Sequence, residues 1–393
     1  MLQLRNKYLV QTISLASASL ILSGCFHTVE DENATSSDHY AIISTQASDN
    51  SAGDISIISL EDYSTDNTNF AGGSDTVVST YDKYIYRLGR FGQDNITRLD
   101  VNDLEATPKQ YSTDDIDDES SNPYKLVVKN DTTGYLIRYG TSKIWVVNPL
   151  ADTAEDFKTA EIDLSVYSGS DNIPEMTDAL IVDDKLYILM QNLDRDNGWI
   201  PQTAYVAVID TNNGNDEIET NTDANTPKGI QLTVTNPNKM VYLSSNNTIY
   251  ISGVGPYFPA DYSGGIESIN LADNSTSLVV DDGDTDTHPY GQINNIAILN
   301  STRGYFVGYS AWQDTAIYSF NPTTGAVDDT ALLENKDISD IEIGPLGNLW
   351  VTDRNNSGIR IFNTVDNSVL KELIDTDLVP SDIEFISVPK SEE

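Results

Sequence analysis

The sequence is poor in the residues that carry out most enzyme chemistry. It has 393 residues but one cysteine and three histidines, and His27 and His39 both lie near its start. One cysteine excludes a disulfide framework, and no His/Cys cluster has the spacing of a transition-metal site. A nucleophile–His arrangement would depend on His288 alone. We therefore expect no enzyme, and keep a divalent-metal-dependent hydrolase or lactonase as an alternative.

Positive charge is scarce as well. The chain has 22 Lys and Arg against 61 Asp and Glu, and from Cys25 onward 20 against 61, a formal net charge of −41. Such a chain repels nucleic acid and anionic headgroups, so neither is an expected partner. The acidic residues are interspersed with Asn, Ser, Thr and Gly, which predicts a solvated surface suited to high salt.

Long hydrophobic runs are missing except at the beginning. Arg5 and Lys7 precede an apolar stretch from Leu9 to Leu22, which is about 14 residues long where a membrane span needs about 20. Leu22-Ser23-Gly24-Cys25 then follows as a small-residue cleavage pattern. Residues 1–24 are therefore predicted to be a signal peptide.

Leu-Ser-Gly-Cys resembles the lipobox of bacterial lipoproteins. The resemblance implies that Cys25 is acylated and becomes the mature N-terminus, with palmitate among the acyl chains, and several chains anchor stably. Phe26 replaces the Asp that favours inner-membrane retention in that family, so the outer membrane is expected. Residues 25–39 are predicted to be a flexible tether.

From Tyr40 to residue 388 the sequence predicts an all-β fold, a seven-bladed β-propeller. Short strands of Ile, Val, Leu and Tyr recur between Gly, Asn and Asp turns with a period of roughly 45 to 60 residues. The seventh unit is the plainest, with strands A to D at 338–343, 348–352, 358–362 and 368–373. Residues 389–393 form a tail.

Two leftover fragments are predicted to complete the first blade. Residues 40–45 and 54–60 read as strands B and C without a strand A, and residues 380–386 read as a strand A with nothing after it. The C-terminal strand would therefore enter the first blade as its innermost strand. Closing the ring removes open sheet edges.

Residues 349–362 also resemble the repeat of the YVTN (YncE-like) propellers, which is specific for fold and says little about function. In such propellers the B–C and D–A connections share one face. The predicted B–C loops of blades four to six are long or aromatic, and a D–A connection adds two more rings. The candidate ligand-binding aromatics are Trp199, Tyr257, Phe258, Tyr262, His288, Tyr290 and Trp312. Local packing under the loops is the alternative.

Five of the eight arginines after residue 24 fall in or at the edge of predicted B–C loops. They are Arg87, Arg90, Arg138, Arg195 and Arg354. Such donors suit carboxylate or phosphate groups of a ligand, and local ion pairing is the alternative.

A third group lies at the start of the predicted inner strands. Its members are Asp75, Asp178, Asn295, Asp340 and Asp382. Oxygen ligands around the channel mouth would suit Ca²⁺, whereas structural capping between blades is the alternative.

The leading hypothesis is a monomeric outer-membrane-anchored lipoprotein that binds a nutrient or cofactor-like small molecule on its loop-rich face. It resembles the surface propeller lipoproteins that present nutrients to an outer-membrane transporter. The second hypothesis is a protein-interaction platform in the cell envelope, with an envelope protein as partner.

Overall fold

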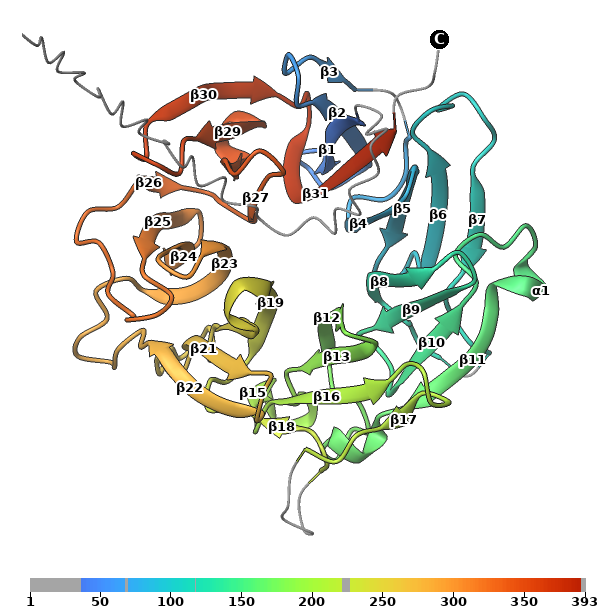
Figure 1. The fold of residues 1–393 in the computed structure, drawn as a ribbon, viewed down its shortest axis with the longest axis horizontal. Coiled ribbons are helices and arrows are strands. Elements are labelled where there is room, and N and C mark those ends of the chain that lie inside the picture. Colours follow the sequence, from blue (N-terminus) through green and yellow to red (C-terminus); the bar gives the residue numbers. More distant parts are fainter. Residues whose placement is uncertain (1–36, 68–69, 117, 221–226, 390–393) are drawn as a thin grey trace, which may run out of the picture.

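The computed structural model describes residues 37–67, 70–116, 118–220 and 227–389. They form seven antiparallel sheets arranged around a central axis (Figure 1), and a small two-stranded sheet of β14 (Leu193–Asp194) and β15 (Ile200–Pro201). The predicted seven-bladed β-propeller is confirmed. The predicted signal peptide, Cys25 and most of the predicted tether lie outside the described residues. Among those residues, no helix is long and apolar enough to cross a membrane.

Each blade is named by its strands from the axis outward. Blade 1 contains β31 (Val379–Pro389), β1 (Ser37–Gln46), β2 (Gly53–Ser59) and β3 (Thr65–Asp66). Blade 2 contains β4 (Thr76–Tyr81), β5 (Tyr84–Gly89), β6 (Asn95–Asp100) and β7 (Lys109–Ser112). Blade 3 contains β8 (Pro123–Asn130), β9 (Thr133–Arg138), β10 (Lys143–Val147) and β11 (Lys158–Asp163), with helix α1 (Ala154–Phe157) before β11.

The remaining four blades follow the same plan. Blade 4 contains β12 (Met176–Val182), β13 (Lys185–Met190), β16 (Tyr205–Asp210) and two short outer strands, β17 (Asp216–Glu217) and β18 (Ile230–Gln231). Blade 5 contains β19 (Pro237–Leu243), β20 (Thr248–Gly253), β21 (Gly265–Asn270) and β22 (Ser275–Val280). Blade 6 contains β23 (Gln292–Asn300), β24 (Arg303–Ala311), β25 (Asp314–Phe320) and β26 (Leu333–Lys336), and blade 7 contains β27 (Ile341–Ile343), β28 (Leu349–Asp353), β29 (Gly358–Phe362) and β30 (Val369–Asp375).

The ring closes as the sequence predicts. The C-terminal strand β31 pairs with β1 along its length, from Ser37 opposite Pro389 to Gln46 opposite Val379. Strand β1 begins at Ser37, so the end of the predicted tether is already sheet. His39 within it shares a 2.7 Å hydrogen bond between its Nδ1 and the Ser387 Oγ.

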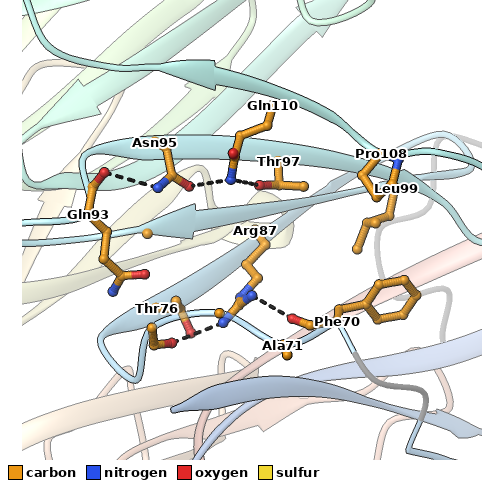
Figure 2. A pocket seen from close by; sticks show the side chains of 13 residues that line it. Phe70, Ala71, Thr76, Arg87, Gln93, Asn95, Thr97, Leu99, Pro108 and Gln110 are labelled. Atoms are coloured by element: carbon orange, nitrogen blue, oxygen red, sulfur yellow. Dashed lines mark hydrogen bonds between the residues drawn. The ribbon is translucent and has the colours of Figure 1, made fainter. Parts of the chain in front are cut away.

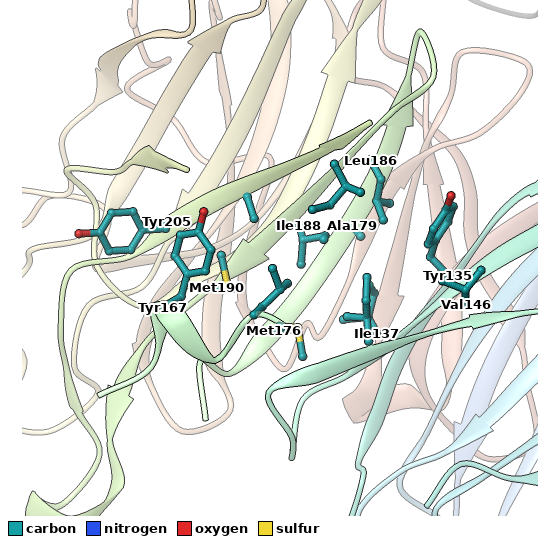
Figure 3. Close-up of a cluster of buried hydrophobic side chains, with 14 residues drawn as sticks. Tyr135, Ile137, Val146, Tyr167, Met176, Ala179, Leu186, Ile188, Met190 and Tyr205 are labelled. Carbon is teal, nitrogen blue, oxygen red and sulfur yellow. The ribbon is translucent and has the colours of Figure 1, made fainter. Parts of the chain in front are cut away.

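The core lies between blades because each central strand is buried on both of its faces. Alternate residues of a strand point to opposite sides. In β13, Leu186, Ile188 and Met190 pack against blade 3 (Figure 3). Tyr187 and Leu189 pack against blade 5 instead. Strand D was predicted only in blade 7, where residues 368–373 correspond to β30. In the other blades it escaped prediction because it is largely exposed and carries little apolar signal, as in β11 and β26.

Neighbouring inner strands are joined by carboxylates that accept backbone N–H groups. Asp178 Oδ2 accepts from Met240 N at 2.7 Å, in the next blade. Asp340 Oδ2 accepts from Ile383 N at 3.0 Å, and Asp382 Oδ2 from Val78 N at 2.8 Å. A polar group buried between blades is stable only when bonded in this way.

We expect Asp178→Ala to lower the free energy of unfolding by about 2–4 kcal/mol. The substitution leaves two backbone N–H groups without an acceptor and removes the salt-bridge partner of Lys125. Urea unfolding measures the change. Asp184→Ala is the matched control, since Asp184 pairs with Lys129 at the surface and should cost less than about 1 kcal/mol. Equal losses in the two variants would contradict the inter-blade role.

Candidate functional site

One face of the ring, here the loop face, carries the B–C and D–A connections. All five of the exposed large aromatic side chains of the described residues lie in its B–C connections. They are Phe91, Trp199, Tyr257, Phe258 and Trp312, between 50% and 94% exposed. The opposite face, the turn face, carries the compact A–B and C–D turns. The predicted concentration of aromatics on one face is therefore present.

Three of the predicted aromatics pack against other rings, although His288 itself is exposed. Tyr290 packs edge-on against Phe306 and Tyr318, with ring centroids 5.5 and 5.1 Å apart, and joins the core between blades 5 and 6. Tyr262 and His288 stack on one another at 4.2 Å. Local packing, the alternative weighed for the sequence, therefore accounts for these three. The blade 6 loop is also shorter than predicted, with Trp312 at the tip of a tight hairpin between β24 and β25.

The predicted arginines divide into two classes. Four of them have an acidic partner, with Arg90 bonded to Asp75, Arg138 to Asp118, Arg195 to Glu175 and Arg354 to Asp337. Local ion pairing therefore explains these four. Arg87 differs, because it is buried and forms no salt bridge among the described residues.

A cleft of about 840 Å³ opens between blades 3 and 4 on the loop face. Arg195 joins its two walls, because its guanidinium lies 4.8 Å from the Trp199 ring and 5.6 Å from the Tyr139 ring. Arg138, Lys143 and Lys158 face five carboxylates across the same cleft. The sequence singled out Trp199 and two of these cations but missed Tyr139, which lies at the end of an otherwise ordinary strand.

The residues of the predicted Ca²⁺ site differ from the set of residues that the structure places around the central channel. Seven equivalent inner-strand positions line a channel cavity of about 210 Å³, namely Val77, Lys125, Asp178, Lys239, Asn295, Asp340 and Asp382. In five of the seven blades a β-bulge lies directly before this inner-strand position. A bulge changes the direction in which a side chain points. An alignment of the seven inner strands at these bulges places Lys125 and Lys239 at the same position as the acidic residues.

The structure gives the residues of the predicted Ca²⁺ site partners within the protein. Asp75 lies two positions outside the ring, where it binds Arg90. Asp178, Asp340 and Asp382 accept inter-blade N–H groups, and Asn295 Nδ2 donates to Asp340 at 2.9 Å. Within the described part of the chain, no three His, Cys, Asp or Glu side chains are placed to hold a metal ion. The structural alternative weighed for the sequence accounts for this group.

Negative charge exceeds positive charge in the channel. Lys125 forms a salt bridge with Asp178 at 2.8 Å. Lys239 forms salt bridges with Asp340 at 2.9 Å and with Glu342 at 2.6 Å. Burial, reinforced by neighbouring carboxylates, raises the pKa of Glu384 from 4.5 to about 8 and that of Asp382 from 3.8 to about 7. Some of the surplus carboxyl groups in the channel are therefore protonated, and uncharged, at neutral pH.

Comparison with known proteins supports the fold. No protein-family model matches the chain, and no curated protein matches its sequence. A solved structure from Bacteroides fragilis, named provisionally as a 6-phosphogluconolactonase, is 14% identical, with 91% of this chain and all of that chain covered and a TM-score of 0.60. The periplasmic gluconolactonase of Pseudomonas aeruginosa is 10% identical over 90% of this chain and all of its own, with a TM-score of 0.57. AztD from Citrobacter koseri is 10% identical over the same shares, with a TM-score of 0.51.

The pKa of Glu384 predicts a pH-dependent stability. A carboxyl whose folded-state pKa is raised binds its proton more tightly in the folded protein, so its contribution is full below about pH 4.5 and is lost as the pH rises through about 8. We expect Glu384→Gln to exceed the wild type in unfolding free energy by about 1–3 kcal/mol at pH 8.5, with a smaller difference at pH 5.

Denaturant unfolding at both pH values checks this expectation. Glu105→Gln, at an exposed turn, is the control and should behave like the wild type at both. A Glu384 variant that is less stable than the wild type at pH 8.5 would contradict the surplus of negative charge.

Proposed function

We propose that this protein is a lipid-anchored component of the bacterial cell envelope that captures a small polar molecule on its loop face. The observation that carries the proposal is the cleft between blades 3 and 4, where cations, carboxylates and the Trp199 ring line one open space. Its volume falls in the range of small-molecule sites. Delivery of the ligand to an outer-membrane transporter belongs to the same proposal.

The ligand that suits the cleft is polar rather than strongly anionic. Each cation of the cleft already has an acidic partner, as Lys143 has in Glu161 and Lys158 in Asp115 and Glu161. An anion would compete with these carboxylates, whereas a ligand rich in hydroxyl or amide groups can bond to both signs. The half-exposed Trp199 ring provides a flat surface for the apolar part of the ligand.

The path of the chain supports a loop face that points away from the membrane. The inner strands start at the loop face, so Pro389 at the end of β31 and its partner Ser37 at the start of β1 lie at the turn face. Cys25 precedes Ser37 by twelve residues, which span at most about 40 Å when extended. A lipid on Cys25 would then hold the turn face toward the bilayer.

The envelope location also has support from the comparisons. One of the matched propellers is a periplasmic enzyme, and the predicted lipobox provides the anchor. Catalysis is not part of the proposal.

A protein partner is the second candidate function. Phe258 and Trp312 are 94% and 80% exposed on blades 5 and 6, and neither lines the blade 3–4 cleft. Large aromatic side chains without a pocket are typical of protein-binding hot spots. Cross-linking through position 312 in cells would trap such a partner.

We expect the full-length lipoprotein, purified from its own envelope, to carry a small molecule that native mass spectrometry detects. Trp199→Ala should reduce its occupancy about fivefold or more, since an aromatic contact of this kind contributes on the order of 1–3 kcal/mol. Trp312→Ala is the matched control and should retain the molecule. If Trp312→Ala alone reduced the occupancy, the ligand would lie outside the cleft and the proposal would fail.

A further inference from the structure

The charge environment of Arg87 is unlike that of every other arginine in the propeller. Eight arginines follow residue 24, and all lie within the described residues. Seven of them form a salt bridge of 4.0 Å or less. Arg87 forms none with the described carboxylates, although acidic residues outnumber basic ones almost threefold. Burial lowers the pKa of the Arg87 guanidinium, and the Asp54 carboxylate offsets only part of that effect. A buried cation without a bonded counter-ion is costly.

Backbone carbonyls hold the Arg87 side chain in place. Its Nη1 donates to Phe70 O at 2.6 Å and its Nη2 to Gly73 O at 3.0 Å. A Cβ on Gly72 would lie 2.1 Å from Nη1, so a side chain at this position would displace the guanidinium. The side chain is 8% exposed, and its Nε is buried without a hydrogen-bond partner. The group is therefore fixed in position with donor capacity left over.

Arg87 faces a cavity of about 550 Å³ between blades 1 and 2 (Figure 2). Strand β3 of blade 1 has only two residues, so the outer strands of blade 2 lack a full facing sheet. One wall of the cavity is polar, with Gln110 Nε2 donating to Asn95 Oδ1 at 3.2 Å and to Thr97 Oγ1 at 3.0 Å. Phe70, Leu99 and Pro108 line it with apolar surface.

We propose that this cavity binds a small molecule with a carboxylate and an apolar body, and that Arg87 is the counter-ion of the carboxylate. Arg87 is the only charged side chain among the described residues that line the cavity, so a single negative charge is the complement. A guanidinium matches a carboxylate in shape and in donors. The proposal goes beyond capture in the blade 3–4 cleft and shares no residue with it.

Isothermal titration calorimetry of the full chain tests the proposal with sodium benzoate and sodium hexanoate at millimolar concentration and low ionic strength. At least one carboxylate should bind, and its neutral amide, benzamide or hexanamide, should bind about tenfold more weakly or not at all. Arg87→Met should weaken the carboxylate by about the same factor. Arg354→Met, which removes a salt-bridged arginine that does not line the cavity, should leave the affinity unchanged.

A second variant covers the case in which Arg87→Met does not fold. Thr97→Phe keeps Arg87 but fills the cavity from β6 with a residue that strands accept, and it should abolish carboxylate binding. Absence of binding by both carboxylates, or equal binding to either variant and the wild type, would overturn the proposal. Tighter Arg87-dependent binding of phenyl phosphate would overturn the assignment to a carboxylate. Loss of native ligand in Trp199→Ala bears on the cleft alone, so the two proposals fail separately.

Discussion

The hydrogen bonds between carboxylates and backbone N–H groups of neighbouring inner strands are the interaction on which the rest of the structure depends. The closing strand β31 takes part on both sides. Its Ile383 N–H donates to Asp340 of blade 7, and its Asp382 accepts from Val78 of blade 2. With no disulfide to join the ends of the chain, these bonds and the β1–β31 ladder close the ring.

A closed ring fixes the positions of its connections, and this determines where binding can occur. Apolar side chains fill most of the space between blades, so cavities lined by polar side chains are exceptions. Two of them lie where the regular packing of blades is interrupted, one beside the short β3 and one under the loop that carries Trp199. The channel is the third, and its surplus carboxylates follow from placing acidic residues on converging strands.

The sequence predicted most of the fold because the inner three strands of each blade are buried. Burial on both faces produces apolar runs that turn residues separate clearly, and the leftover fragments at 40–60 and 380–386 located the ring closure. Most outer strands were missed because strands such as β11 and β26 are largely exposed. Their residues are selected for solvent contact, which leaves no period to detect.

The candidate site could be predicted only in part. Position along a strand indicated that Trp199, Phe258 and Trp312 lie in loops of one face, and they do. Position could not distinguish Arg87 from Arg138, because the difference lies in whether a carboxylate from a distant segment comes within reach. Tyr290 was misjudged for a related reason, since its partners Phe306 and Tyr318 belong to strands that follow it in the chain.

The central claim is that the loop face is the binding face and is turned away from the membrane. Fluorescence quenching of the lipidated protein in bilayers tests it most directly, with the Trp312 signal obtained by difference from Trp312→Phe. Trp145, Trp199 and Trp350 are present in both proteins, so their signals cancel in the difference, and Trp145 and Trp350 are also buried. The account predicts that aqueous acrylamide quenches Trp312 while brominated acyl chains do not. Quenching of Trp312 by brominated lipid would place the loop face on the bilayer and contradict it.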